Sequence, residues 1–167
     1  MIQALEQQLV DWLRAWLPDR KVEPYPDNPD GYDFGRGARK GLVLVRWNGS
    51  SYGKPKDISV GHQDREIEFA LSIVAASLRD RTGIYPLLEA TRDGLAGWRP
   101  KGGNGFRPVS EGFVAMRGNV WRYDLVITTT LPYVPPIQPD PPLAESMTAI
   151  FEDRDMQVLG QMPREDT

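Results

Sequence analysis

The chain has 167 residues, a length that fits one domain with a sizeable hydrophobic core. It contains no cysteine, which excludes disulfides and thiolate metal sites, and no apolar run approaches the ~20 residues of a membrane span. The net charge is −3, with the acidity concentrated after residue 131, so the near-neutral remainder argues against strong non-specific binding to nucleic acid.

Residues 2–17 predict an amphipathic helix, because apolar side chains recur on one face and Pro18 ends the pattern. Trp12 and Trp16 lie on this apolar face, and two tryptophans imply a large contact area. We expect them to pack on a sheet. The alternative is that part of this face docks on another subunit.

A short strand is predicted over residues 20–25, followed by a long loop over 27–40 that is rich in glycine, proline and aspartate. Residues 42–47 form a nearly continuous apolar run, which is typical of a central strand covered at least in part on both faces. Residues 48–53 have the composition of a turn, and a polar loop continues to about residue 63.

Residues 65–77 fit two patterns. Ile67, Phe69, Leu71 and Ile73 alternate as in a strand, whereas the apolar positions of the same segment also match a helical stripe. We choose the strand, because β-branched and aromatic residues occupy the alternating positions.

The best-delimited helix is predicted from Ile84 to Trp98, and it supplies a partner for the apolar face of the sheet. Pro86 suits the first turn of a helix. Gly94 weakens the last turn, and Gly97 can adopt the left-handed conformation that caps a helix.

Two further strands are predicted over 106–117 and 120–131, joined by a hairpin turn at Gly118-Asn119. From Pro132 the composition changes to proline-rich and acidic, which predicts an extended C-terminal arm over 132–167. Within this arm, residues 143–155 could form a short helix. The fold class is therefore an α+β domain over residues 1–131, in which an N-terminal and a central helix pack on a mainly antiparallel sheet of four or five strands.

Few residues are typical of catalytic or cofactor sites. His62 is the single histidine and falls in a polar loop, where a surface role is the ordinary one. The glycine-rich segments 35–41 and 102–105 do not fit the phosphate-binding pattern with its terminal Gly-Lys-Ser/Thr.

A row of carboxylates is the one acidic cluster of note. Asp64, Glu66 and Glu68 share a face of the predicted strand, where three carboxylates could hold Mg²⁺. A solvated or intersubunit face is the commoner use of such a row, and like charges on one strand face require opposing cations. A neighbouring subunit could supply them, from Arg36, Arg39 or Lys40.

Five segments together carry a resemblance to a known family. They are Val22 to Pro26, Gly41 to Ser51 with Tyr52, Arg65-Glu66, Leu87 to Trp98 with Arg92 and the ending Leu95-Ala96-Gly97-Trp98, and Trp121-Arg122-Tyr123. In their order and spacing they resemble the tail terminator (tail completion) family of Mu-like bacteriophages and prophages. The resemblance covers residues 1 to about 131, and the arm has no counterpart in it.

This resemblance implies a structural virion protein that forms a hexameric ring at the head-proximal end of the tail tube. The ring ends tube polymerisation and joins the tail to the neck, without catalysis, metal or cofactor. The implied partners are further copies of the chain, the tail tube protein, the neck or head-completion protein and, in a contractile tail, the sheath protein. DNA passes through the ring without specific binding, and no membrane is involved. The expected location is the phage tail, and the host cytoplasm during assembly.

The sequence is also compatible with two other functions. One is a Mg-dependent hydrolase or nuclease that uses the acidic row, and the other is a monomeric binding module whose proline-rich tail recruits a partner with an aromatic groove. The candidate subunit or partner contacts are charged residues of the predicted surface: Arg36, Arg39, Lys40, Lys54, Lys56, Glu66, Glu68, Glu89 and Arg92.

Overall fold

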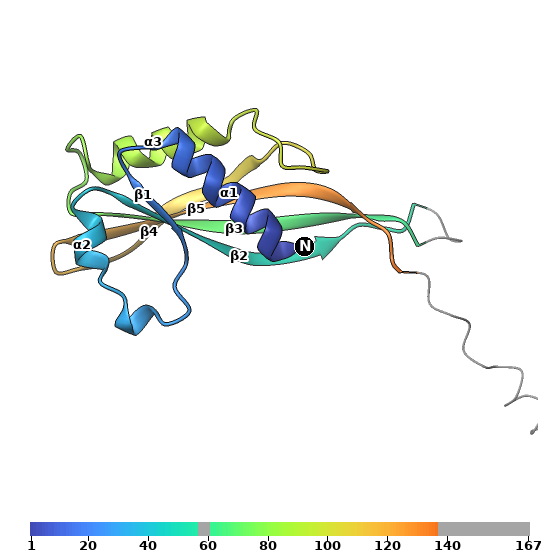
Figure 1. Ribbon diagram of the computed structural model, residues 1–167, viewed down its shortest axis with the longest axis horizontal. Helices are drawn as coiled ribbons and strands as arrows, with labels where there is room; N and C mark the ends of the chain where they lie inside the picture. The colour runs from blue at the N-terminus through green and yellow to red at the C-terminus, as the bar shows by residue number, and fades with distance from the viewer. Residues whose placement is uncertain (57–60, 137–167) are drawn as a thin grey trace, which may run out of the picture. The chain divides into compact units, whose positions relative to one another are not determined.

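The computed structural model describes residues 1–56 and 61–136 (Figure 1). The chain divides into two units, Met1–Val134 and Pro135–Thr167. None of the described helices is long and apolar enough to cross a membrane. The helices and strands, in chain order, are α1 (Ile2–Trp16), β1 (Lys21–Pro24), the 3-10 helix η1 (Pro29–Gly31), α2 (Phe34–Ala38), β2 (Leu42–Tyr52), β3 (Gln63–Ala75), α3 (Ile84–Leu95), β4 (Arg107–Arg117) and β5 (Val120–Tyr133).

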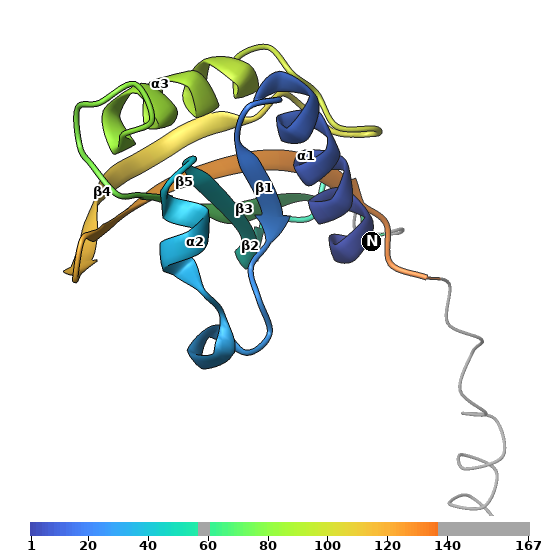
Figure 2. The ribbon, with the colours of Figure 1, turned by 60° about the vertical axis from the view of Figure 1, so that its left-hand side comes forward.

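The five strands form one sheet in the order β1-β2-β3-β5-β4. β1 runs parallel to β2, and every other neighbouring pair is antiparallel. Helices α1 and α3 cover one face of the sheet, and the short helix α2 covers part of the other (Figures 1 and 2). The predicted α+β class and the mainly antiparallel sheet are confirmed.

The alternating pattern of β3 builds the main core. Ile67, Phe69, Leu71 and Ile73 are fully buried on the face covered by α1 and α3, so the choice of strand over helix for this segment is confirmed. The first residues of β2 are buried on both faces, since α2 covers the opposite side through Ala38. This confirms the prediction from their continuous apolar run.

The predicted turn at residues 48–53 is wrong. β2 continues through it to Tyr52, and a bulge between Trp47 and Gly49 absorbs one residue. The ladder to β3 resumes after the bulge, with Ser50 opposite Ile67, so pairing along a long neighbouring strand outweighs the local turn composition.

The loop predicted over 27–40 is also more ordered than expected, because it contains η1 and α2. The side chain of Asp33 caps α2 by accepting a hydrogen bond of 3.0 Å from the backbone N–H of Arg36. At the other end of the sheet, β5 continues through Pro132 and Tyr133. Residues 137–167, which hold most of the expected arm and its short helix, lie outside the described residues.

The tryptophans of α1 contact α3 and the segment that follows it. Trp12 stacks on Trp98 at 5.4 Å between ring centroids, and its Nε1 donates to the carbonyl of Gly94 at 2.7 Å. Trp16 donates to the carbonyl of Ala90 at 2.9 Å. Gly94 makes this approach possible, because a Cβ there would lie 2.6 Å from Nε1 and 2.7 Å from Cγ of Trp16.

Candidate interaction surfaces

The acidic row lies on the face of β3 opposite to the main core, and cations of the same chain oppose it. Lys56 pairs with Asp64 at 2.8 Å, and Arg107 pairs with Glu66 at 2.5 Å. The amide of Asn48 donates to Glu68. Two of the three carboxylates are therefore paired with cations of the same chain, and the third accepts from a neutral amide.

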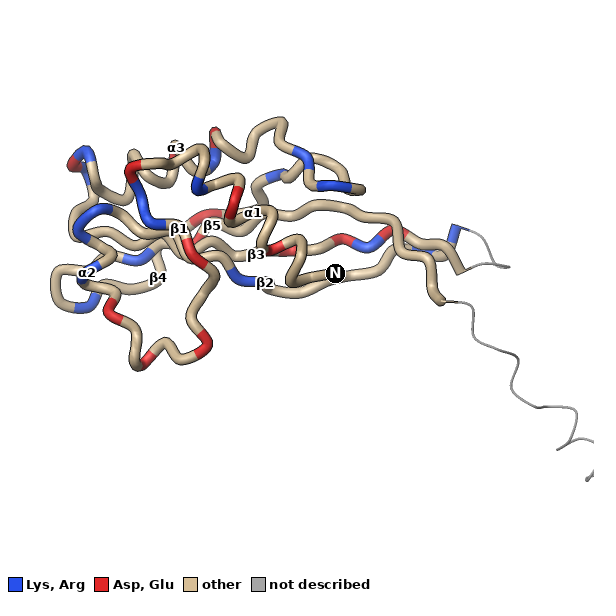
Figure 3. The backbone as a smooth tube through the Cα atoms, viewed as in Figure 1, with Lys and Arg blue, Asp and Glu red and all other residues tan. Residues whose placement is uncertain are grey.

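These carboxylates also lie apart as metal ligands. Among residues 1–56 and 61–136, no three histidine, aspartate, glutamate or cysteine side chains are placed to hold a metal ion together. Figure 3 shows acidic positions along β3, and two of these carboxylates form surface ion pairs, Asp64 with Lys56 and Glu66 with Arg107. Exposed pairs of this kind contribute little stability each.

A second polar cluster lies nearer the α2 end of the same sheet face. Asp124 of β5 accepts from Arg46 of β2 at 3.1 Å, from Ser72 of β3 at 2.8 Å and from Arg122 at 3.3 Å. Both guanidinium groups lie against the ring of Tyr25, 5.5 and 5.4 Å from its centroid. The cluster joins three strands and the segment after β1, and it is a structural element.

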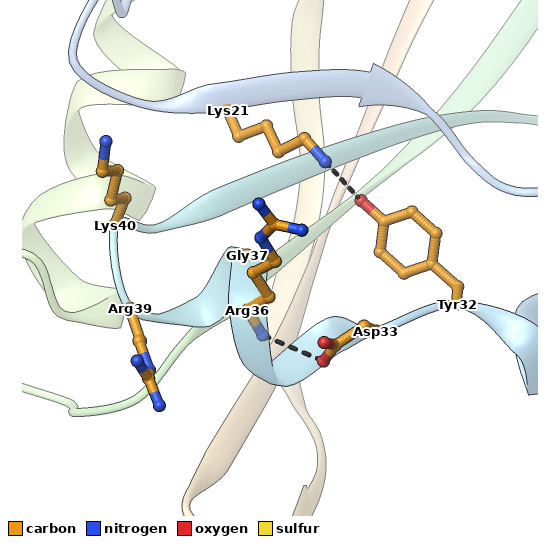
Figure 4. Close-up of a pocket in the computed structure, with 7 residues that line it drawn as sticks. All are labelled: Lys21, Tyr32, Asp33, Arg36, Gly37, Arg39 and Lys40. Carbon is orange, nitrogen blue, oxygen red and sulfur yellow. Dashed lines mark hydrogen bonds between the residues drawn. The ribbon is translucent and has the colours of Figure 1, made fainter.

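A basic pocket lies between β1 and α2 (Figure 4). The cavity of about 720 Å³ is lined by Lys21, Tyr32, Asp33, Arg36, Gly37, Arg39 and Lys40. Arg36 and Lys40 project toward the side of α2 that faces Lys21, whereas Arg39 projects away from it. The three cations predicted as contacts from this segment are thus neighbours on α2 and its C-terminal end, and they form no ion pair within the described residues.

Lys21 of this pocket is already engaged. Its Nζ lies 3.1 Å from Glu23, and this hydrogen bond raises the pKa of Lys21. Burial by itself raises the pKa of Glu23, but the hydrogen bonds from Tyr32 and Lys21 outweigh it and leave that pKa lowered. Burial, and then the hydrogen bond to Glu23, raises the pKa of the Tyr32 hydroxyl. The pocket wall is therefore a fixed hydrogen-bonded triad beside freely projecting arginines.

The remaining candidate contacts fall in two places. Arg92 of α3 pairs at 2.9 Å with both carboxylate oxygens of Glu111 on β4, and Glu89 lines a small neighbouring cavity of about 310 Å³. Lys54 is exposed in the segment that follows β2. Arg92 therefore joins the helix to the sheet, while the other two are available at the surface.

The apolar surface is the feature that the sequence reading missed. One exposed group follows β4: Val109, Phe113, Val114 and Met116, with Tyr85 of α3 nearby. Phe113 contacts Trp121 and Tyr123 edge to face, and Tyr123 contacts Tyr85 in the same way, so an aromatic cluster continues from the strand toward α3. A second group is Trp47 and Tyr52 on the later half of β2.

These two groups lie at opposite lateral sides of one sheet. β4 is the last strand of the order and pairs with β5 alone. On the other side, β1 pairs with Leu42 to Val45 only, so Arg46–Tyr52 of β2 has no strand beside it in the part of the chain that the structure describes. We call these the β4 edge and the β2 edge. Exposed apolar groups of this kind mark protein contacts more often than catalytic sites.

The fold and its surfaces define an α+β protein built on a mainly antiparallel sheet with two unlike apolar edges. The Gp37 protein family model matches residues 9–152, and the chain belongs to this family. Among solved structures, a chain of the virion of the native gene transfer agent (GTA) particle is similar, with 16% sequence identity and a TM-score of 0.48. The match covers 79% of this chain and 95% of that chain. No match was found among the curated proteins.

Proposed function

We propose that the protein is a structural subunit of a phage-type tail, a tail terminator that forms a ring at the head-proximal end of the tail tube. The observation that carries the proposal is the pair of unlike apolar edges on opposite sides of one sheet. The residue pattern over positions 1–131 that resembles the Mu-like tail terminator family supports the same assignment.

Two unlike patches on one chain suit a head-to-tail contact, in which the first patch of each copy meets the second patch of the next. Such a contact makes a closed ring when the rotation per copy closes, and the resemblance points to six copies. The exposed apolar residues of both edges are liabilities on a monomer and become buried in a ring.

The proposed role is mechanical. The ring covers the last tube ring, which stops the addition of tube subunits, and it presents its other side to the neck protein. In a contractile tail it also meets the sheath. Catalysis, metal and cofactor play no part in this role, and DNA passes through the ring without specific contacts.

An assembly assay tests the proposal. Purified chain, marked with a gold label at an N-terminal tag, is added to tail tube protein during polymerisation, and tube lengths are measured by electron microscopy. We expect shorter tubes, each with label at one end. A tube length that is unaffected by the chain, or label distributed along the tubes, would overturn the assignment. Phe113→Asp on the β4 edge is the matched variant, and we expect it to restore long, unlabelled tubes.

A further inference from the structure

We propose that the β4 edge of one copy lies antiparallel against the β2 edge, Arg46–Tyr52, of the next copy, so that the sheets of neighbouring subunits join side by side. This inference rests on the proposed function and specifies the contact that closes its ring. The occupant of each edge is a second copy of this chain.

The first support is the direction of the strands. β2 is antiparallel to β3, β3 to β5 and β5 to β4, so β4 runs opposite to β2 within each subunit. When identical subunits stand edge to edge in the same orientation, β4 of one copy therefore meets β2 of the next in the antiparallel sense. Antiparallel pairing is the more stable of the two ways in which strands can pair.

The second support is the apolar surface on both sides of the proposed contact. Phe113 is 57% exposed on the β4 edge, and Trp47 and Tyr52 are 46% and 50% exposed on the β2 edge. Aromatic residues with this exposure are typical of the centres of protein interfaces, where they fill pockets on the partner. The contact covers them on both copies at once.

The third support is charge. Within one sheet the ladders put Trp47 level with Pro108, so the contact requires the next copy to be displaced along the strands, as in a sheared barrel. With that displacement, the antiparallel alignment brings the Arg117 end of β4 to the Trp47 end of β2. Glu6 lies close to the backbone of Trp47, and its pKa is raised first by burial and then by the neighbouring carboxylate of Asp27. Glu6 is thus an acidic group beside the β2 edge, with the carboxylate of Asp27 within electrostatic range of it, and Arg117 forms no ion pair within the described residues. The contact would place the cation beside Glu6.

The irregularities of β4 set the length of the contact. Its ladder to β5 shifts register between Pro108 and Ser110 and again between Phe113 and Ala115. Bulges and an edge proline discourage unlimited strand addition by unrelated chains. The first bulge and Pro108 end the contact at Ser110, and the second bulge falls inside the segment from Ser110 to Arg117 that faces the β2 edge, so the contact is short.

The chain has no cysteine, so thiol crosslinking can occur only at cysteines that are introduced. A chain carrying both Ser51→Cys and Val114→Cys has one thiol on each edge, and a short bifunctional maleimide should join neighbouring copies. We expect a ladder of bands at multiples of 18.8 kDa, both at tube ends and in any free ring. The control pairs Val114→Cys with Asp19→Cys, an exposed position in the turn between α1 and β1, and we expect no ladder from it.

A charge exchange provides a second readout. Arg117→Glu should weaken association roughly two- to fivefold, the range of exposed ion pairs, and adding Glu6→Lys should restore it. Particles that cap tubes but give no Ser51/Val114 ladder would overturn this contact and leave the terminator assignment standing. Failure to cap tubes, with a ladder still present, would overturn the terminator assignment and keep the contact. Absence of the ladder in both free and tube-bound chain overturns the inference.

Discussion

The packing of α1 on α3 yields a prediction that runs against ordinary helix propensity. Replacing glycine by alanine inside a helix usually stabilises it, by about 1 kcal/mol. Gly94→Ala in α3 should instead destabilise this protein, because the new Cβ would lie 2.6 Å from Nε1 of Trp16. That distance is too short for any real contact, so the indole has to move.

The magnitude follows from three contributions. Overpacking of a tight contact costs about 1–3 kcal/mol. Displacing the indole of Trp16 weakens its hydrogen bond to Ala90, which has a net contribution of about 0.5–1.5 kcal/mol. After subtracting the gain in helix propensity, we expect the free energy of unfolding to fall by roughly 0.5–3.5 kcal/mol.

Urea unfolding followed by circular dichroism measures this change, and a double-mutant cycle identifies its cause. Trp16→Ala removes the side chain that the Cβ meets. In that background Gly94→Ala should stabilise the protein by up to about 1 kcal/mol, as in an ordinary helix. Equal destabilisation by Gly94→Ala in both backgrounds would refute the reasoning, since the cost would then have nothing to do with the indole.

Three further outcomes are expected. Asp124→Ala should lower the free energy of unfolding by about 1.5–3 kcal/mol in urea titrations, because it leaves two arginines and a serine without their carboxylate in a partly buried site; a cost no larger than that of an exposed ion pair would contradict the described cluster. Tyr32→Phe removes a hydrogen bond that holds the pKa of Glu23 low, and a lowered pKa gives stability that is present at neutral pH and lost as the pH falls through the folded-state pKa. Wild type should therefore be slightly more stable than this variant at pH 7, and the difference in the free energy of unfolding should vanish in acid. A difference that grows as the pH falls would contradict the lowered pKa of Glu23. A chain that ends at Val134 should keep its circular dichroism spectrum and unfolding midpoint, and insolubility of this truncation would show that residues 135–167 are needed for folding.

The local patterns predicted the elements well where one face of each element is buried by the protein itself. Every second residue from Ile67 to Ile73 is apolar because one face of β3 packs under the helices, and this spacing is visible in the sequence. The turn predicted at residues 48–53 was wrong because the deciding interaction is with another strand. Their composition favours a turn, but the neighbouring strand β3 is long enough to pair with them, and a single bulge corrects the register.

Interactions between distant segments could not be predicted in the same way. The row of Asp64, Glu66 and Glu68 was placed correctly on one face, yet its counter-charges come from the segment after β2 and from the start of β4. Which cations lie opposite depends on the strand order β1-β2-β3-β5-β4, and no local pattern contains that order. The role of Gly94 was misjudged similarly, because the partner that requires it lies 78 residues earlier, at Trp16.

The same dependence on strand order explains why the two apolar edges went unnoticed. The segment Val109 to Met116 has the composition of an ordinary strand, and only its position at the end of the sheet exposes both of its faces. β2 illustrates the converse. β1 pairs with β2 only as far as Val45, so the first residues of β2 are covered by a neighbouring strand and the later residues form an open edge. A subunit interface built from such edges is therefore a property of the folded sheet, and its residues carry the ordinary composition of strands.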